Sequence, residues 1–253
     1  MKSFITILFV SLSLQTMADC AGSGIYFWPA DYSLTPNSFI VVTGYASSEE
    51  LVLGLGTKYE VFLENKSEKI KLVPVQTEVG GFHLSQIALK PEKELALGSS
   101  YQYVVYGADD NSFLDQVYNY TKGQREPVFF NVSKKPETIP PAWIKKPEFV
   151  KSEYIPFGCG PGKWIKYHFQ IEETSNFLFR INLTHVINKS SVTFSITAEE
   201  GFLLIGHGMC SGAFEFIDGD NYEFTVDLID ECGNVTLWTD DPVQFTAPAA
   251  VDY

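Results

Sequence analysis

The stretch FLLIGHGMCSGAFEF, residues 202–216, has the spacing in this 253-residue chain that most suggests catalysis. From Gly208 it spells G-x-C-x-G beside His207, a pattern typical of a nucleophile at a sharp turn between a strand and a helix. Residues 202–205 predict the strand, but the residues that follow alternate and turn without a helical period. His207 is also too close in sequence to serve Cys210 as a base in ordinary geometry. We therefore expect Cys210 to be structural rather than catalytic.

Two acidic loops form the second group of candidates, because carboxylate and amide oxygens suit Ca²⁺. Weak candidates for such a site are Asp109, Asp110 and Asp115 in one loop, and Asp218 and Asp220 in another. Neither loop matches the twelve-residue EF-hand pattern, and aspartate is also a good turn former, so we favour the turn interpretation. The four histidines show no paired ligand spacing, so the sequence predicts no metal site and no cofactor.

Aromatic side chains are the third group, since exposed rings can stack on sugars. The candidates for this role are Trp28, Trp143, Trp164 and Trp238. The competing interpretation is that tryptophans in strands pack in a core.

The first residues predict export. Lys2 precedes an apolar run over residues 4–14, and Thr16 and Ala18 take the small-residue positions of a cleavage site. This layout is typical of a secretory signal peptide over residues 1–18, and the run is too short to span a membrane. A lipoprotein acylated at Cys20 is the less favoured alternative, because Asp19 stands where a small neutral residue is required. We expect a periplasmic, outer-surface or extracellular protein with no transmembrane segment.

The chain is acidic, with a formal net charge of −13. Phosphate binding requires clustered Lys and Arg, so this charge argues against nucleic acid as a partner. It argues equally against anionic membrane surfaces. We attribute the charge to solubility.

The elements that position these residues are predicted to be strands. Short alternating runs rich in β-branched and aromatic residues occur throughout, bounded by Gly, Asn, Asp, Ser or Pro, and no long segment has a 3.6-residue period. Clear examples are residues 38–44, 58–65, 100–107 and 222–229. The sequence therefore predicts an all-β protein. Prolines and lysines concentrate between residues 133 and 149, which indicates a semi-rigid linker. We place it at 136–146, between domains at 19–135 and 147–253; one larger sandwich or barrel is the alternative.

Two segments carry a resemblance to a known family. LKPEKELALGSSYQYVVYGADD, residues 89–110, resembles the late-strand signature of bacterial Ig-like and fibronectin type III-like domains, with Leu95, Gly98, Tyr101 and Tyr103 at matching positions. FIDGDNYEFTVDLIDECGN, residues 216–234, repeats the theme. The resemblance implies two tandem immunoglobulin-like β-sandwich domains, and it implies fold rather than function.

The resemblance also implies a disulfide pairing. It places the Cys210 loop before the fifth strand and the Cys232 turn after the sixth, at one end of the second sandwich, so these two cysteines are expected to form a bridge. Cys159 is the competing partner for these cysteines, since four cysteines allow three pairings, and Cys20–Cys159 is the weaker second pair.

These features predict an exported bacterial, non-enzymatic protein with a structural, adhesive or ligand-binding role at the cell envelope. Its partner would be an unidentified protein or a polysaccharide. A carbohydrate-binding protein that uses exposed aromatics is the first alternative. A secreted hydrolase built on Cys210 or on a carboxylate pair is the second.

Overall fold

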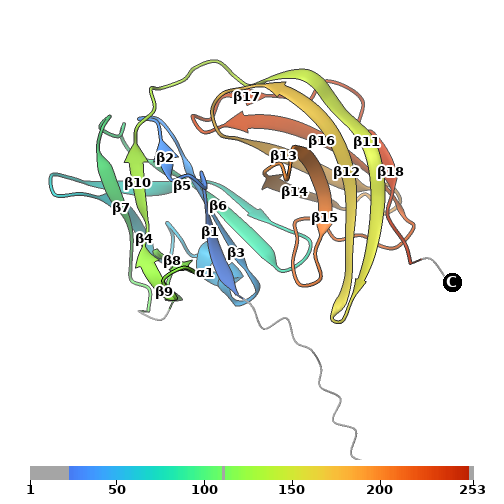
Figure 1. Ribbon diagram of the computed structural model, residues 1–253, viewed down its shortest axis with the longest axis horizontal. Coiled ribbons are helices and arrows are strands. Elements are labelled where there is room, and N and C mark those ends of the chain that lie inside the picture. The colour runs from blue at the N-terminus through green and yellow to red at the C-terminus, as the bar shows by residue number, and fades with distance from the viewer. Residues whose placement is uncertain (1–22, 110–111, 251–253) are drawn as a thin grey trace, which may run out of the picture.

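The protein is nearly all β in the computed structural model, which describes residues 23–109 and 112–250. Figure 1 shows two halves side by side, the first in blue and green and the second in yellow and red. The single α-helix of the described residues, α1 (Glu49–Leu53), is short and follows the 3₁₀ turn η1 (Ala46–Ser48). Neither helical segment has the length and hydrophobicity that a membrane span requires.

The first half is built from one eight-stranded sheet in the order β1-β3-β6-β5-β4-β7-β10-β2. Its strands are β1 (Gly24–Trp28), β2 (Ser33–Leu34), β3 (Ile40–Tyr45), β4 (Glu60–Glu64), β5 (Lys69–Val79), β6 (Leu84–Pro91), β7 (Ser100–Tyr106) and β10 (Phe129–Val132). All pairs are antiparallel except β10 with β2. A separate hairpin joins β8 (Gln116–Asn119) to β9 (Gln124–Pro127).

Strand β5 lets this sheet fold over on itself. Its first residues pair with β4, and from Leu72 onward it pairs with β6. The register of β5 against β6 shifts between Pro74 and Gln76. Proline has no N–H to donate to a neighbouring strand, and such an irregularity in the ladder is where a strand can hold one. The fold encloses one core, in which Tyr101, Tyr103 and Phe130 are fully buried.

The second half contains two sheets that face each other. A three-stranded sheet has β11 (Ala142–Phe157), β12 (Gly160–Glu172) and β15 (Phe202–His207) in that order. The five-stranded sheet contains β14 (Ser191–Ile196), β13 (Phe177–His185), β16 (Asn221–Asp230), β17 (Val235–Thr236) and β18 (Val243–Thr246). Here β16 pairs with β13, β17 and β18, and β14 lies at the far edge. Ile165 and Ile205 from the first sheet pack against Phe179 and Val226 from the second.

The predicted linker is shorter than expected. Strand β11 begins at Ala142, inside the predicted 136–146 segment, and runs on past Pro147. Only β12 pairs with β11, so this edge strand can hold a proline without losing a second ladder. Register shifts on either side of Glu148 accommodate the irregular stretch.

The two halves are packed together through an apolar cluster and two sets of polar contacts. The cluster consists of Trp28, Phe39, Val41, Leu178 and Ile229, all buried. It joins the outer face of β1 and β3 to the outer face of β13 and β16.

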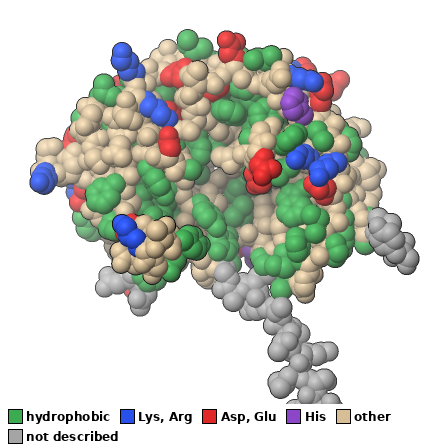
Figure 2. Space-filling view, in the orientation of Figure 1, with side chains coloured by type: hydrophobic (Ala, Val, Ile, Leu, Met, Phe, Trp, Pro, Cys, Tyr) green, Lys and Arg blue, Asp and Glu red, His purple; other side chains and the backbone are tan. Residues whose placement is uncertain are grey.

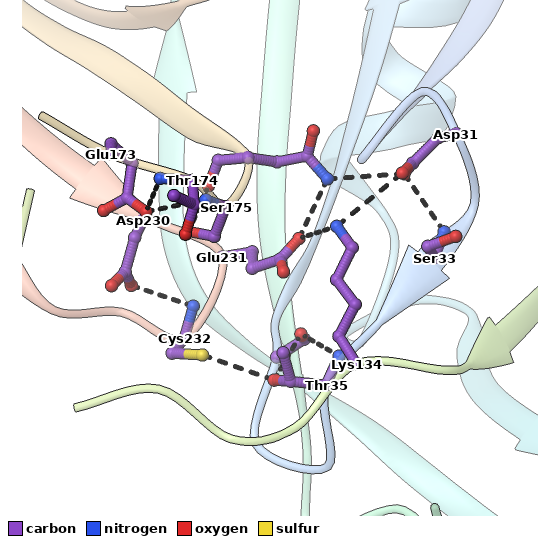
Figure 3. Close-up of polar contacts among 12 residues, drawn as sticks. Asp31, Ser33, Thr35, Lys134, Glu173, Thr174, Ser175, Asp230, Glu231 and Cys232 are labelled. Carbon is purple, nitrogen blue, oxygen red and sulfur yellow. Dashed lines mark hydrogen bonds and ion pairs between the residues drawn. The ribbon is translucent and has the colours of Figure 1, made fainter. Parts of the chain in front are cut away.

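One set of contacts lies at the start of β3. The Phe39 N–H donates to the Glu231 carbonyl (3.1 Å), and Lys134 pairs with the Glu231 carboxylate at 3.0 Å. Figure 3 shows Asp31 and Lys134 gathered around Glu231. The other set lies at the opposite end of β3: Phe82, in the β5–β6 turn, and Gly212 exchange backbone hydrogen bonds of 3.2 and 2.8 Å. We call these two sets the Glu231 contact and the Gly212 contact.

Candidate functional site

Four tyrosines gather on the outer surface of the first half: Tyr26, Tyr45, Tyr118 and Tyr120. We call them the tyrosine surface. Tyr120 is 89% exposed, Tyr26 is 61% exposed and Tyr118 is 46% exposed. Large exposed rings gathered from separate elements distinguish this patch from the isolated exposed apolar residues that are normal on any protein.

Strands β1 and β3 hold the first pair of rings. Tyr26 points outward between Ile25 and the buried Phe27, as the alternation of a half-buried strand requires. Tyr45, the last residue of β3, stacks on it with centroids 5.7 Å apart and planes at 18°. Gly24 makes room for this arrangement, because a Cβ there would lie 2.6 Å from the Tyr45 ring.

The β8–β9 hairpin holds the second pair. Tyr118 lies on β8 and Tyr120 in the turn, with ring centroids 5.0 Å apart in an edge-to-face arrangement. The turn closes through Gly123, whose φ is +66° and whose N–H donates to the Asn119 carbonyl at 2.8 Å. Lys122 and Glu126 form an ion pair across it at 2.6 Å. In Figure 1 this hairpin lies beside α1, at the lower end of the first half.

The electrostatics of the tyrosine surface are those of neutral phenols. Partial burial raises the pKa of Tyr26, and the Tyr45 and Tyr120 hydroxyls raise it further. The influence of Tyr120 shows that the two pairs are neighbours. Tyr26 therefore stays uncharged at physiological pH, and its hydroxyl can both donate and accept a hydrogen bond.

None of the four tryptophans lies among the exposed large side chains of the described residues. Trp28 is 9% exposed between the two halves. Trp143 and Trp238 pack on each other with centroids 6.1 Å apart, next to the second core. Trp164 is half-buried. The structure thus favours the packing interpretation of the tryptophans.

The predicted bridge between Cys210 and Cys232 is not formed, since Cys232 carries a free, buried thiol. Its sulfur lies 3.3 Å from Thr35 Oγ1, as Figure 3 shows, and burial raises its pKa. The error lies in the strand assignment: Cys210 follows the fifth strand, β15, and precedes β16, whereas Cys232 follows β16. Ten residues of β16 separate the loops by about 30 Å, against roughly 5.5 Å for a bridge.

The other cysteine predictions are not tested by the structure. Cys20 lies outside the described residues, so its weaker pairing with Cys159 stays a prediction. Cys159 lies in the turn between β11 and β12. The prediction that Cys210 joins a disulfide stays open for its two remaining partners in the sequence.

Packing explains the glycines around Cys210. A Cβ on Gly212 would lie 2.3 Å from the His207 Cα, and one on Gly206 would lie 1.9 Å from the Lys163 carbonyl oxygen. His207 is buried and its Nδ1 lies 2.8 Å from the Gly208 carbonyl, to which it donates. Strand β15 leads into a loop and not into a helix, so the fold around Cys210 lacks the strand–turn–helix of a nucleophile elbow.

The aspartates of the two acidic loops, the weak calcium candidates of the sequence, lie in different surroundings among the described residues. Asp218 pairs with Lys163, and Asp220 lies 2.8 Å from His185. Asp109 and Asp115 line one hollow of about 230 Å³, without a third His, Cys, Asp or Glu among the described residues, and Asp110 lies outside those residues. Burial raises the pKa of Asp115, whose carboxylate accepts from the Val105 N–H.

One unpredicted carboxylate group could hold a cation. Ligand oxygens of Glu137, Glu173 and Asp230 lie within 4.8 Å of one another. Partial burial raises the pKa of Glu137, and the carboxylates of Glu173 and Asp230 raise it further. Asp230 already fixes the turn after β16, because it accepts hydrogen bonds from the backbone of Cys232 and Asn234 at 2.9 and 2.8 Å.

Figure 2 shows one face of the molecule, on which hydrophobic side chains form patches over both halves while charged groups are scattered.

No family model matches this chain, and no curated protein is similar to it. Among solved structures, a type I pullulanase from Bacillus subtilis, complexed with maltose, matches at 10% identity and a TM-score of 0.25. The match covers 84% of this chain and 23% of the pullulanase. A pullulanase from an Anoxybacillus species matches at 12% identity and a TM-score of 0.25, over 82% of this chain and 27% of that one.

A DUF3823 family protein from Bacteroides ovatus matches at 11% identity and a TM-score of 0.21, over 75% of this chain and 88% of that one. This chain thus spans about a quarter of the length of the two pullulanases. At these TM-scores the matches support no inference about function.

Proposed function

We propose that the chain is an exported, non-enzymatic carbohydrate-binding protein of the bacterial cell envelope, and that it holds a neutral polysaccharide on the tyrosine surface. The observation that carries the proposal is the gathering of four tyrosines, three of them exposed, from two strands and a hairpin turn. Aromatic faces stack on the C–H faces of sugar rings, while phenolic hydroxyls bond sugar hydroxyls at the edge.

The charge distribution favours a neutral sugar over an anionic one. The surface is built from tyrosines and not from acidic or basic side chains, and the ion pair nearest in sequence, Lys122–Glu126, is internally balanced. The whole chain is acidic, so an anionic polymer would be repelled at long range.

Strand order supports immunoglobulin-like sandwiches in both halves. If β1, β3, β4, β5, β6, β7 and β10 are lettered A to G in chain order, the sheet of the first half has the order A-B-E-D-C-F-G. Strand β2 is then a second A strand, which pairs with strand G. In the second half, β11, β12 and β15 correspond to strands A, B and E and form one sheet. The other sheet contains β13, β14 and β16, which correspond to C, D and F, together with the short strands β17 and β18 in the place of G. Such sandwiches place loops and outer strand faces at the surface, where a binding site can be built without altering the core.

The arrangement around Cys210 supports a non-enzymatic role, since packing accounts for its glycines and a loop follows its strand. Export is proposed from the sequence of residues 1–18, which lie outside the described residues. Mass spectrometry of the secreted protein should find Asp19 at its N-terminus.

The test of the binding proposal uses the exported protein and a panel of neutral and anionic polysaccharides in affinity gels. We expect Tyr120→Ala and Tyr26→Ala each to weaken binding about fivefold, since one ring contact contributes on the order of 1 kcal/mol. The double variant should lose retardation. The recovered polysaccharide should keep its chain length, which separates binding from hydrolysis.

Tyr106→Ala is the matched control, because Tyr106 is a comparably exposed tyrosine on β7, 42% accessible, that packs on Phe62. Equal loss in the control and in Tyr120→Ala would refute the proposal, as would a panel in which no neutral polysaccharide retards the protein. Shortening of the bound polysaccharide would favour the hydrolase alternative.

A further inference from the structure

A cleft of about 290 Å³ lies between the two halves, distinct from the tyrosine surface. Strands β3, β5 and β6 form one side, and β13, β14 and β16 form the other. It lies between the Glu231 contact and the Gly212 contact, which hold the two sides at a fixed separation. A preformed hollow of this kind at a domain interface is the usual location of a small-molecule site.

The cleft is built around a buried carboxylate. Glu78 is 6% exposed and accepts hydrogen bonds from the side chains of Gln76 and Gln86. From the second half, the Ser195 N–H donates to it at 2.6 Å and the Arg180 Nε lies 3.4 Å away. Gln86 also donates to the Ser195 carbonyl at 3.1 Å. These contacts fix the position of Glu78 from both halves, and Glu78 in turn pairs with Arg180.

The guanidinium of Arg180 is only partly used by this network. Its side chain is 41% exposed and lines the cleft, and its ion pair with Glu78 is the only one recorded for it among the described residues. Its Nε is buried without a well-formed hydrogen bond in that part of the chain. A planar fork of donors that is held in place and open to a cavity is suited to a carboxylate.

The charge of the lining supports an anionic ligand. Lys90 and Arg180 contribute two positive charges and Glu78 one negative charge, which leaves the lining at +1 in a chain whose formal charge is −13. The remaining walls are mostly apolar, formed by Phe39, Val41, Ala88, Leu178 and Ile229.

We propose that this cleft binds a small monocarboxylate with a hydrocarbon body, the carboxylate on Arg180 and the chain against the apolar walls. The volume is about that of ten water molecules in the liquid, which matches a carboxylate with eight carbons. The two contacts that fix the halves keep the site preformed, so binding needs no ordering of loops.

The test is isothermal titration of the full chain with octanoate and with its neutral analogue octanamide. Ligand efficiencies for ten non-hydrogen atoms predict a dissociation constant of roughly 0.1–1 mM for octanoate. Octanamide and the variant Arg180→Gln should each bind at least tenfold more weakly. Ala88→Leu, which fills the apolar wall, should weaken octanoate binding while leaving the charges intact.

Lys93→Gln is the charge-matched control, since Lys93 pairs with Glu68 on another face of the first half, and it should bind octanoate like the native chain. Equal affinity for octanoate and octanamide would overturn the proposal. Absence of any heat of binding with 10 mM octanoate at two well-separated temperatures would also overturn it, because apolar burial changes the heat capacity. The comparison with octanamide and the measurement of octanoate binding both use the native chain. They therefore test the proposal even if Arg180→Gln fails to fold. The double variant of Tyr26 and Tyr120 should still bind octanoate, so the two proposals fail separately.

Discussion

At the scale of single residues, packing and ion pairs account for the glycines and aspartates that a catalytic or calcium-binding pattern would use. Gly212 looks like part of a catalytic motif, yet its small size lets the loop pass against His207 and join Phe82 of the first half. Asp218 and Asp220 look like calcium ligands, yet each has a basic partner. Local sequence shows which residues are unusual, whereas contacts distant in sequence decide what they do.

Gly212→Ala should destabilise the protein by about 1–3 kcal/mol, because the added methyl group overlaps the backbone of His207. Chemical denaturation followed by circular dichroism measures the change. Gly208→Ala is the control in the same loop, where a Cβ meets its first neighbour at 3.5 Å. The control should change stability by less than about 0.5 kcal/mol. Similar effects of the two substitutions would contradict the packing account.

At the scale of elements, alternation predicted most of the strands that surround the two cores. The runs at 38–44, 58–65, 100–107 and 222–229 coincide with β3, β4, β7 and β16 within a few residues. Each has one face buried in a core, which gives the two-residue period its strength.

Elements without one clean buried face were harder to predict. Strand β11 lies at an edge and is exposed along much of its length, so its prolines and lysines resembled a linker. The tyrosine surface could not be predicted either, because Tyr26 and Tyr120 are 94 positions apart. The cleft depends on how the two halves dock, which no local pattern encodes.

Limited proteolysis should distinguish the irregular segment that connects the two halves from the paired strand β11. Glu137 lies in the irregular segment between the halves, whereas Glu148 is paired in the β11 ladder. A glutamate-specific protease at low concentration should cut after Glu137 well before Glu148, because cleavage requires a locally extended, unpaired backbone. Intact-mass analysis of a time course identifies the first cut. Initial cleavage after Glu148 would show that β11 is not stably paired.

At the scale of the whole molecule, the apolar cluster and the two sets of polar contacts couple the halves. Leu178 of the second half is 4% exposed because it packs in that cluster with side chains of the first half. An interface with a buried apolar centre and backbone hydrogen bonds at both ends favours unfolding of the two halves as one unit.

Leu178→Asp should uncouple the halves, because it places a charge in the apolar contact. Differential scanning calorimetry should show one transition for the native chain and two for the variant. Ile187→Asp, at a position that is 75% exposed in the same half, should leave a single transition. Two transitions in the native chain would show that the halves are thermodynamically independent.

The spacing of the Glu231 and Gly212 contacts has a mechanical consequence. They lie at opposite ends of β3, so a torque about an axis perpendicular to β3 that opens one contact presses the other together, and the pair resists this bending. Tension between a ligand on the first half and an attachment point on the second would load both contacts in parallel. The molecule would therefore transmit a pull at constant length, and a bound polysaccharide would be held at a fixed angle under flow.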